Sequence, residues 1–222
     1  MNAVDLPALI AASAALLAGL LIWRHRARRQ RRHFIAQFDY ARLLDARLAK
    51  RRPELSATQR RQVLDALRDW FLISKAAGRR KLAMPSQAVD DAWHEFILFT
   101  RNYKDFCQRG LGRFLHHVPA EAMSAPTQAQ DGIKRSWRLA CKHEAIDPNA
   151  PARLPRLFAL DGTLAIVGGF TYHLDCMARG AAGANGYCAG HIGCGGGCSG
   201  CGSDSGGDSG CGSSCGGGCG GD

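Results

Sequence analysis

The chain begins with an unbroken apolar run and continues with short apolar stripes at helical spacing. The run from Leu6 to Trp23 contains no charged side chain over 18 residues. A helix rises 1.5 Å per residue, so this segment reaches about 27 Å, enough to cross a thin bilayer core. Pro7 falls in the first turn, where its missing N–H costs nothing. This pattern predicts a transmembrane anchor over residues 1–23.

Two further helices are expected directly after the anchor. Apolar residues recur every three or four positions from Phe34 to Lys50, and Pro53 ends that stretch. Ser56 and Gln59 have the spacing of a capping box, which opens a second apolar stripe that ends at Gly78. The two helices are predicted to form an antiparallel pair joined by a short turn.

Three more helical stretches follow in the sequence. Ser86 is expected to cap the first of them, because a Ser side chain can accept from the free N–H groups of the first turn. The second breaks at Gly110–Gly112, and the third begins at a capping box made by Thr127 and Gln130. A helical-bundle-like domain over residues 34–175 therefore follows the anchor.

Beyond Pro148 the pattern becomes irregular. Two short apolar runs, Leu157–Leu160 and Leu164–Val167, flank the dipeptide Asp161-Gly162. Asp-Gly between two apolar runs is a common hairpin signal, so a small β-hairpin is predicted here. The fold class expected for the whole chain is mainly α, with one transmembrane helix, one helical domain and a disordered tail.

Charge sets the orientation of the anchor. The net charge is +10, and residues 24–33 form a basic juxtamembrane segment. Positive residues stay in the cytoplasm, which places the N-terminus outside and the rest of the chain inside the cell membrane. A cleaved signal peptide is the alternative, but the residues before Leu6 include Asp5 and no Lys or Arg. The residues expected at the membrane interface are Trp23, Arg24, Arg26, Arg28 and Arg29.

The excess of positively charged residues extends beyond the juxtamembrane segment. Residues 34–174 contain 22 Lys or Arg against 14 Asp or Glu, so anionic partners are favoured. Next to a membrane, anionic lipid headgroups are the simplest partner for the arginines. Binding to nucleic acid is a weaker hypothesis, because the chain has neither an RNA-recognition strand motif nor a zinc-finger pattern.

A group of histidines supplies the candidate chemistry of the helical domain. Asp90 and His94 lie four residues apart on one helical face, and His117 follows a Gly-containing bend that can return it to that helix. His94 and His117 are therefore candidate ligands for zinc or iron(II), with Asp90 orienting an imidazole. The alternative is a purely structural role, since no H-E-x-x-H spacing is present. Trp93 is expected in the core, and His94 is expected to be accessible near His117.

The same segment resembles a known family. The motif that carries the resemblance is Val89-Asp90-x-x-Trp93-His94, then Tyr103 and Cys107, then Gly112-x-x-x-x-His117. It is similar to the signature of the glycine-rich domain-containing protein family, best known from plants. The resemblance implies a helical domain over about residues 34–175 and no defined activity. Plant members often have a second His shortly after Trp-His, where this chain has Phe96. That departure weakens the case for a shared metal site.

Residues 176–222 form a tail of unusual composition, with 8 Cys and 19 Gly. The cysteines with metal-ligand spacing are Cys194, Cys198, Cys201, Cys211, Cys215 and Cys219. The tail offers only Tyr187 and Ile192 as larger apolar side chains near these thiols, and glycine is costly to order. A flexible tail is therefore predicted, in which reduced thiols could hold zinc adaptably.

Three hypotheses for function follow, in this order. The first is a membrane-anchored, non-enzymatic interaction protein whose tail holds metal and whose protein partner is unidentified. The second is a metal-dependent enzyme built on His94 and His117. The third is a nucleic-acid-binding protein. The sequence contains no P-loop, Rossmann glycine pattern or nucleophile elbow that would indicate nucleotide or acyl-transfer chemistry.

Overall fold

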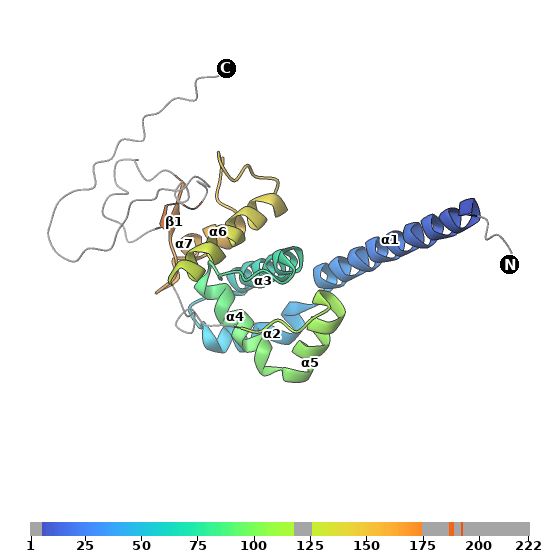
Figure 1. Cartoon of the computed structure of the whole chain (residues 1–222). Coiled ribbons are helices and arrows are strands. Elements are labelled where there is room, and N and C mark those ends of the chain that lie inside the picture. The colour runs from blue at the N-terminus through green and yellow to red at the C-terminus, as the bar shows by residue number, and fades with distance from the viewer. Residues whose placement is uncertain (1–5, 118–125, 175–186, 189–191, 193–222) are drawn as a thin grey trace, which may run out of the picture.

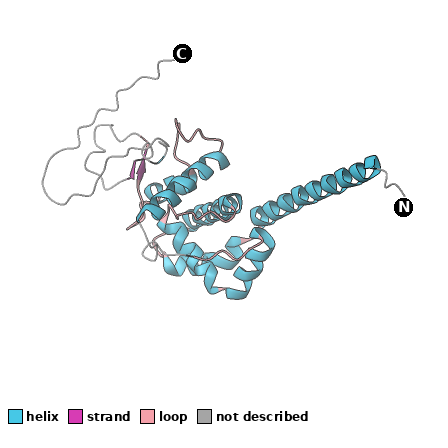
Figure 2. Cartoon of the chain, in the orientation of Figure 1, coloured by secondary structure: helices cyan, strands magenta, loops and turns pink. Residues whose placement is uncertain are grey.

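The computed structural model describes residues 6–117, 126–174, 187–188 and 192. These residues are mainly helical, which confirms the predicted fold class, and strands are confined to one small patch (Figure 2). The elements are α1 (Leu6–Gln37), α2 (Tyr40–Arg51), α3 (Ala57–Ala77), α4 (Gln87–Leu98), α5 (Thr100–Phe106), the π-helical turn η1 (Cys107–Leu111), α6 (Pro126–His143), α7 (Arg156–Thr163), β1 (Tyr172–His173) and β2 (Tyr187–Cys188).

Helix α1 extends away from the other helices as a single rod (Figure 1). Its apolar stretch is long enough to cross a membrane, and none of that stretch is buried against the protein. A helix of this kind near an N-terminus is either a membrane anchor or a signal sequence. Trp23 and the arginines up to Arg29 are exposed, whereas Ile35, near the other end of α1, is fully buried. One continuous helix therefore joins the apolar segment to the core of the domain.

The predicted helix over residues 34–50 is in fact two helices. Its first residues belong to the end of α1, and the chain bends at Phe38 and Asp39 before α2 begins. The Asp39 carboxylate accepts a hydrogen bond from the backbone N–H of Arg42 at 3.0 Å. An Asp at this position stabilises a new helix start, so the apolar spacing continues although the helix does not.

The predicted starts of α3 and α4 are confirmed. Ser56 and Gln59 form a reciprocal capping box at α3, and Gly78 ends that helix with a φ of 65°. The Ser86 hydroxyl caps α4 by accepting from the backbone N–H of Val89. These caps fix where α4 begins, and therefore which of its residues face the loop that follows η1.

Aromatic rings fill the centre of the domain. Phe71 of α3 and Phe106 of α5 lie with ring centroids 4.7 Å apart, and Phe38 lies 4.9 Å from Phe106. Trp93 is buried and packs edge-on against Phe71, which confirms its predicted place in the core. The edge-to-face arrangement of these rings is the favoured one for aromatic pairs.

The turn after α5 brings the chain back towards α1. Gly112 has a φ of 77°, a left-handed conformation that glycine adopts without strain, and its N–H bonds to the Cys107 carbonyl at 2.8 Å. At Gly110 a Cβ atom would lie only 2.8 Å from Cγ1 of Ile35. The predicted break at Gly110–Gly112 is thus where η1 packs closely against α1 and the chain turns towards His117.

The predicted β-hairpin around Asp161-Gly162 is wrong, because these residues belong to α7. The buried members of α7 are Leu157, Phe158, Leu160 and Asp161, which fall on one helical face. Asp161 makes its hydrogen bonds to the start of α4. Its carboxylate accepts from the Ser86 hydroxyl and the Gln87 N–H, both at 2.6 Å. Asp161 therefore caps the N-terminus of another helix, and no hairpin forms here.

Three described residues of the predicted tail pack with the domain. Strand β2 pairs in parallel with β1, matching Tyr172 with Tyr187. The Ile192 side chain is only 8% exposed and belongs to the hydrophobic core. Ile192, one of the two larger apolar side chains of that segment, is therefore part of the domain. The six tail cysteines proposed as ligands lie outside the described residues.

Candidate metal site

Helix α4 and the loop after η1 together build the candidate site. Asp90 and His94 lie one helical turn apart on α4, so their side chains emerge from the same face. His117 lies in the loop that follows Gly112. The structure therefore brings His117 to the helix that carries the other two residues, as the sequence predicts.

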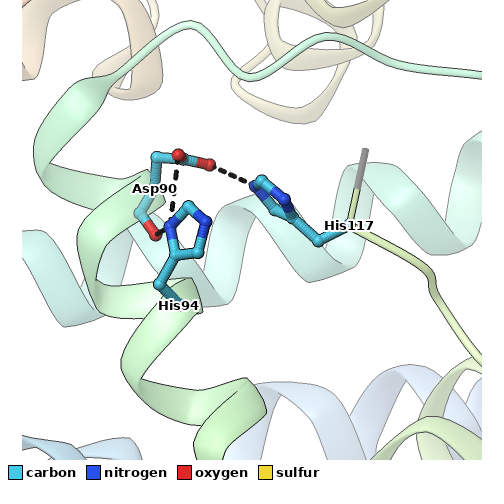
Figure 3. A group of neighbouring side chains, drawn as sticks. All are labelled: Asp90, His94 and His117. Carbon is cyan, nitrogen blue, oxygen red and sulfur yellow. Dashed lines mark hydrogen bonds and ion pairs between the residues drawn. The ribbon is translucent and has the colours of Figure 1, made fainter. Parts of the chain in front are cut away.

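The three side chains are in mutual contact (Figure 3). His117 Nε2 lies 2.8 Å from Asp90 Oδ1, and His94 Nδ1 lies 3.3 Å from Asp90 Oδ2. The two imidazole rings lie with centroids 4.2 Å apart. One potential ligand atom from each residue lies within 4.8 Å of the others. The carboxylate thus contacts both imidazoles, rather than orienting only one of them.

A buried hydrogen-bond chain holds His117 in place. Trp93 Nε1 donates to the Tyr103 hydroxyl at 3.0 Å, and that hydroxyl donates to the Leu115 carbonyl at 2.6 Å. The Trp93 ring also packs edge-on against the His117 ring, with centroids 4.6 Å apart. The loop that carries His117 is therefore fixed to α4 and α5 two residues before the histidine.

Burial is uneven across the three residues. The side chain of His117 is 12% exposed and that of Asp90 is 19% exposed, whereas that of His94 is 45% exposed. His94 therefore forms the open side of the site. A ligand would enter past His94 and meet the more buried Asp90 and His117.

Neighbouring residues of similar type have other roles. The His116 ring packs edge-on against Phe114, away from the group of three. Asp91, next to Asp90, is buried and paired with Arg52 of the α2 end, with Nη2 and Oδ2 2.6 Å apart. This ion pair and the Asp161 cap hold α4 at both sides of its first turn. Sequence reasoning missed both, because each pairs residues that are about 40 or more positions apart.

The two described free thiols are not part of the site. Cys107 and Cys141 are both buried. Burial raises the pKa of the Cys107 thiol, and burial together with nearby acidic groups raises the pKa of Cys141 to about 11. Neither residue is a thiolate near neutral pH, and only the thiolate is an effective metal ligand.

The arrangement has the donors that zinc prefers. Zinc bonds to imidazole nitrogen and carboxylate oxygen are about 2.0–2.2 Å long, so two ligands at a tetrahedral angle lie roughly 3.4 Å apart. Asp90 Oδ1 and His117 Nε2 lie 2.8 Å apart and would separate slightly to bind one ion, and His94 would add its Nε2, because its Nδ1 faces the Asp90 carbonyl oxygen at 2.9 Å. Three protein ligands would leave a fourth position open on the side of His94.

Comparison with known proteins places the chain in a family. Residues 30–192 match the model of the UCP032817-like family, well over half of the sequence. The chain belongs to the UCP032817-like family. No curated protein and no solved structure matches it. The relation to the plant glycine-rich domain proteins stays a prediction.

The family model covers the helical domain of this UCP032817-like protein but not the apolar run before it. The matched range contains Asp90, His94 and His117, and it ends at the buried Ile192. The apolar run from Leu6 to Trp23 lies before it. The candidate site thus belongs to the part that defines the family, whereas the apolar run of α1 lies outside it.

Proposed function

We propose that this UCP032817-like protein is a membrane-anchored metal-binding protein whose helical domain holds a zinc ion with Asp90, His94 and His117. The observation that carries the proposal is the convergence of three potential ligand atoms within 4.8 Å of one another. One of the three comes from a loop that a buried hydrogen-bond chain fixes in place. A preformed site of this kind binds metal without first ordering its ligands.

The hydrogen bonding of His94 also supports the proposal. Its Nδ1 lies 2.9 Å from the backbone carbonyl oxygen of Asp90. An imidazole that donates Nδ1–H to a carbonyl has its Nε2 lone pair free, which is the usual arrangement for a metal-binding histidine. The backbone of α4 thus orients the exposed ligand of the site.

Zinc analysis of the full-length protein in detergent tests this function. The wild type should bind one more equivalent of zinc than His94→Ala, whatever the tail thiols contribute to the total. His116→Ala is the matched control, because this neighbouring ring packs on Phe114 instead of the site. The proposal fails if His94→Ala and His117→Ala retain the same zinc content as His116→Ala.

A metal-dependent enzyme is the second candidate function. It is favoured by the number of ligands, since catalytic zinc sites have three protein ligands and an open position for water. The exposed side of the site at His94 would admit a substrate. Azide added to the cobalt-substituted protein should change the cobalt absorption spectrum if that position is open. An unchanged spectrum would indicate a closed, non-catalytic site.

The membrane topology belongs to the same proposal. The exposed apolar part of α1 spans the cell membrane with the N-terminus outside, and the arginines after Trp23 keep the domain in the cytoplasm. The continuity of α1 into the core, where Ile35 is fully buried, favours an anchor over a cleaved signal sequence. In the reducing cytoplasm the tail cysteines would remain thiols able to hold zinc.

A further inference from the structure

Cationic side chains from three elements meet at the turn that follows η1. Arg31 of α1 donates from Nη1 to the Gln108 carbonyl at 3.1 Å. Lys75 of α3 donates from Nζ to the Leu111 carbonyl at 2.8 Å. Arg113 donates to the carbonyl of Gly78, directly after α3. With Arg28, one turn before Arg31 on α1, these residues form the four-cation cluster: Arg28, Arg31, Lys75 and Arg113.

Gly112 makes room for this cluster. A Cβ atom at Gly112 would collide with the guanidinium group of Arg31. Arg31 therefore lies directly against the backbone of the turn, beside the residue that begins the path to His117. Three members of the cluster, Arg31, Lys75 and Arg113, are half-buried, while Arg28 is exposed.

The positive charge of the cluster is not balanced within the described part of the chain. Each ion pair there joins other residues, and no carboxylate lies within ion-pair distance of Arg28, Arg31, Lys75 or Arg113. The carbonyls come from the ends of α3 and η1, and a helix end supplies only about half a negative charge. Two such ends offset about one of four positive charges. Burial and the neighbouring arginines also lower the pKa of Lys75.

The cluster lies beside the apolar segment of α1. Arg28 follows Trp23 by five residues and Arg31 by eight, so they stand about 7.5 and 12 Å beyond it along the helix axis. The headgroup layer of a bilayer adds roughly 5–8 Å on each side of the hydrocarbon core. Arg28 therefore lies at headgroup depth, and Arg31 lies one helical turn further along α1.

We propose that the four-cation cluster binds the phosphate group of an anionic lipid headgroup. This proposal rests on the membrane anchor proposed above. It makes Lys75 and Arg113, two residues of the folded domain, part of the surface that contacts the membrane. Arginine forms bidentate hydrogen bonds to phosphate, and lysine adds a point charge. A bound lipid would fix the domain against the membrane surface, with α3 and the η1 turn facing the headgroups.

The test uses full-length protein in detergent, titrated with phosphatidylglycerol and followed by native mass spectrometry. Arg28→Gln combined with Lys75→Gln should weaken binding about 30-fold or more, because each cation that contacts the phosphate directly contributes a charge-assisted hydrogen bond worth about tenfold. The matched control is Arg26→Gln with Arg29→Gln, which removes the same charge from the opposite face of α1. It should change the affinity by less than about threefold, because charges beyond about 8 Å are screened.

Each outcome decides for or against the lipid site. Equal weakening by both variants would mean unspecific attraction and would overturn the proposal, as would no preference over phosphatidylcholine. Inorganic phosphate that competes at the same concentration would assign the cluster to a soluble anion instead of a lipid. If Lys75→Gln impairs folding, the exposed variant Arg28→Glu decides alone. Membrane fractionation tests the anchor separately. A chain that is found in the membrane but shows no preference for phosphatidylglycerol would contradict the lipid site and leave the proposed anchor unaffected.

Discussion

At the scale of single residues, Tyr103 connects the core to the candidate site through one hydroxyl group. The hydroxyl accepts from Trp93 and donates to the Leu115 carbonyl, two residues before His117. This hydroxyl is the hydrogen-bond partner of both groups, and Tyr103 itself is buried. The spacing of Trp93, Tyr103 and His117 in the sequence thus has a physical reason, since all three belong to one contact network.

Replacement of Tyr103 by Phe should therefore affect both stability and metal binding. Trp93 Nε1 and the Leu115 carbonyl would lose their partner, which costs about 1–3 kcal/mol of unfolding free energy. Loosening the loop of His117 should weaken zinc binding about 10-fold or more, as for other residues that orient a ligand. Urea unfolding and zinc titration measure the two effects.

Tyr40→Phe is the matched control for that experiment. The Tyr40 hydroxyl is also buried and donates to the Ile35 carbonyl at 3.1 Å, but it has no contact with the site. It should lower stability by a similar amount and leave zinc affinity unchanged. Equal zinc affinity in both variants would contradict the role assigned to Tyr103.

At the scale of elements, Asp161 attaches α7 to the start of α4. Its carboxylate accepts from the Ser86 hydroxyl and from the backbone N–H groups of Gln87, Ala88 and Phe170. Helix starts leave N–H groups without partners, and here a side chain from another helix satisfies them. The position of α4, and with it Asp90 and His94, depends on this contact.

Asp161→Ala should destabilise the domain by at least about 2 kcal/mol, because several buried donors lose their acceptor together. Asp147→Ala is the matched control. Asp147 also accepts a backbone N–H, from Asn149 at 2.9 Å, but that pair is exposed. The control should cost less than about 1 kcal/mol, as surface substitutions do. Similar losses in urea unfolding for both variants would mean that Asp161 is an ordinary surface cap.

At the scale of the whole molecule, the boundary between domain and tail decides which truncations fold normally. A chain that ends at Gly193 keeps β2 and the buried Ile192, whereas a chain that ends at Cys176 loses both. The longer chain should melt within about 2 °C of the full protein. The shorter chain should melt about 5 °C lower or more, since loss of a buried Ile costs about 2 kcal/mol. Equal midpoints would show that residues 177–193 contribute nothing.

The orientation of α1 can be tested on the whole chain. A reporter that is active only outside the cytoplasm should stay inactive when fused after Asp222, because the proposed topology has the arginines after Trp23 on the cytoplasmic side. The same reporter fused before Met1 should be active. The reverse result would place the tail cysteines in an oxidising environment, where disulfides form.

The sequence by itself determined the features that depend on neighbours in the chain. The apolar helix, the capping box at Ser56, the cap at Ser86 and the break at Gly110–Gly112 follow from local periodicity and hydrogen bonding. The closeness of His94 and His117 was also predicted, because the Gly-containing bend before His117 can return the chain to the helix of His94.

Only the tertiary structure decided the features that depend on distant partners. Asp161-Gly162 has the local pattern of a turn, but Asp161 is buried where it satisfies the N-terminus of α4. Ile192 follows a glycine-rich stretch and is nevertheless part of the core. The four-cation cluster joins residues from α1, α3 and the turn after η1. Local propensity carries no information on such contacts, because their free energy arises only when separate elements pack together.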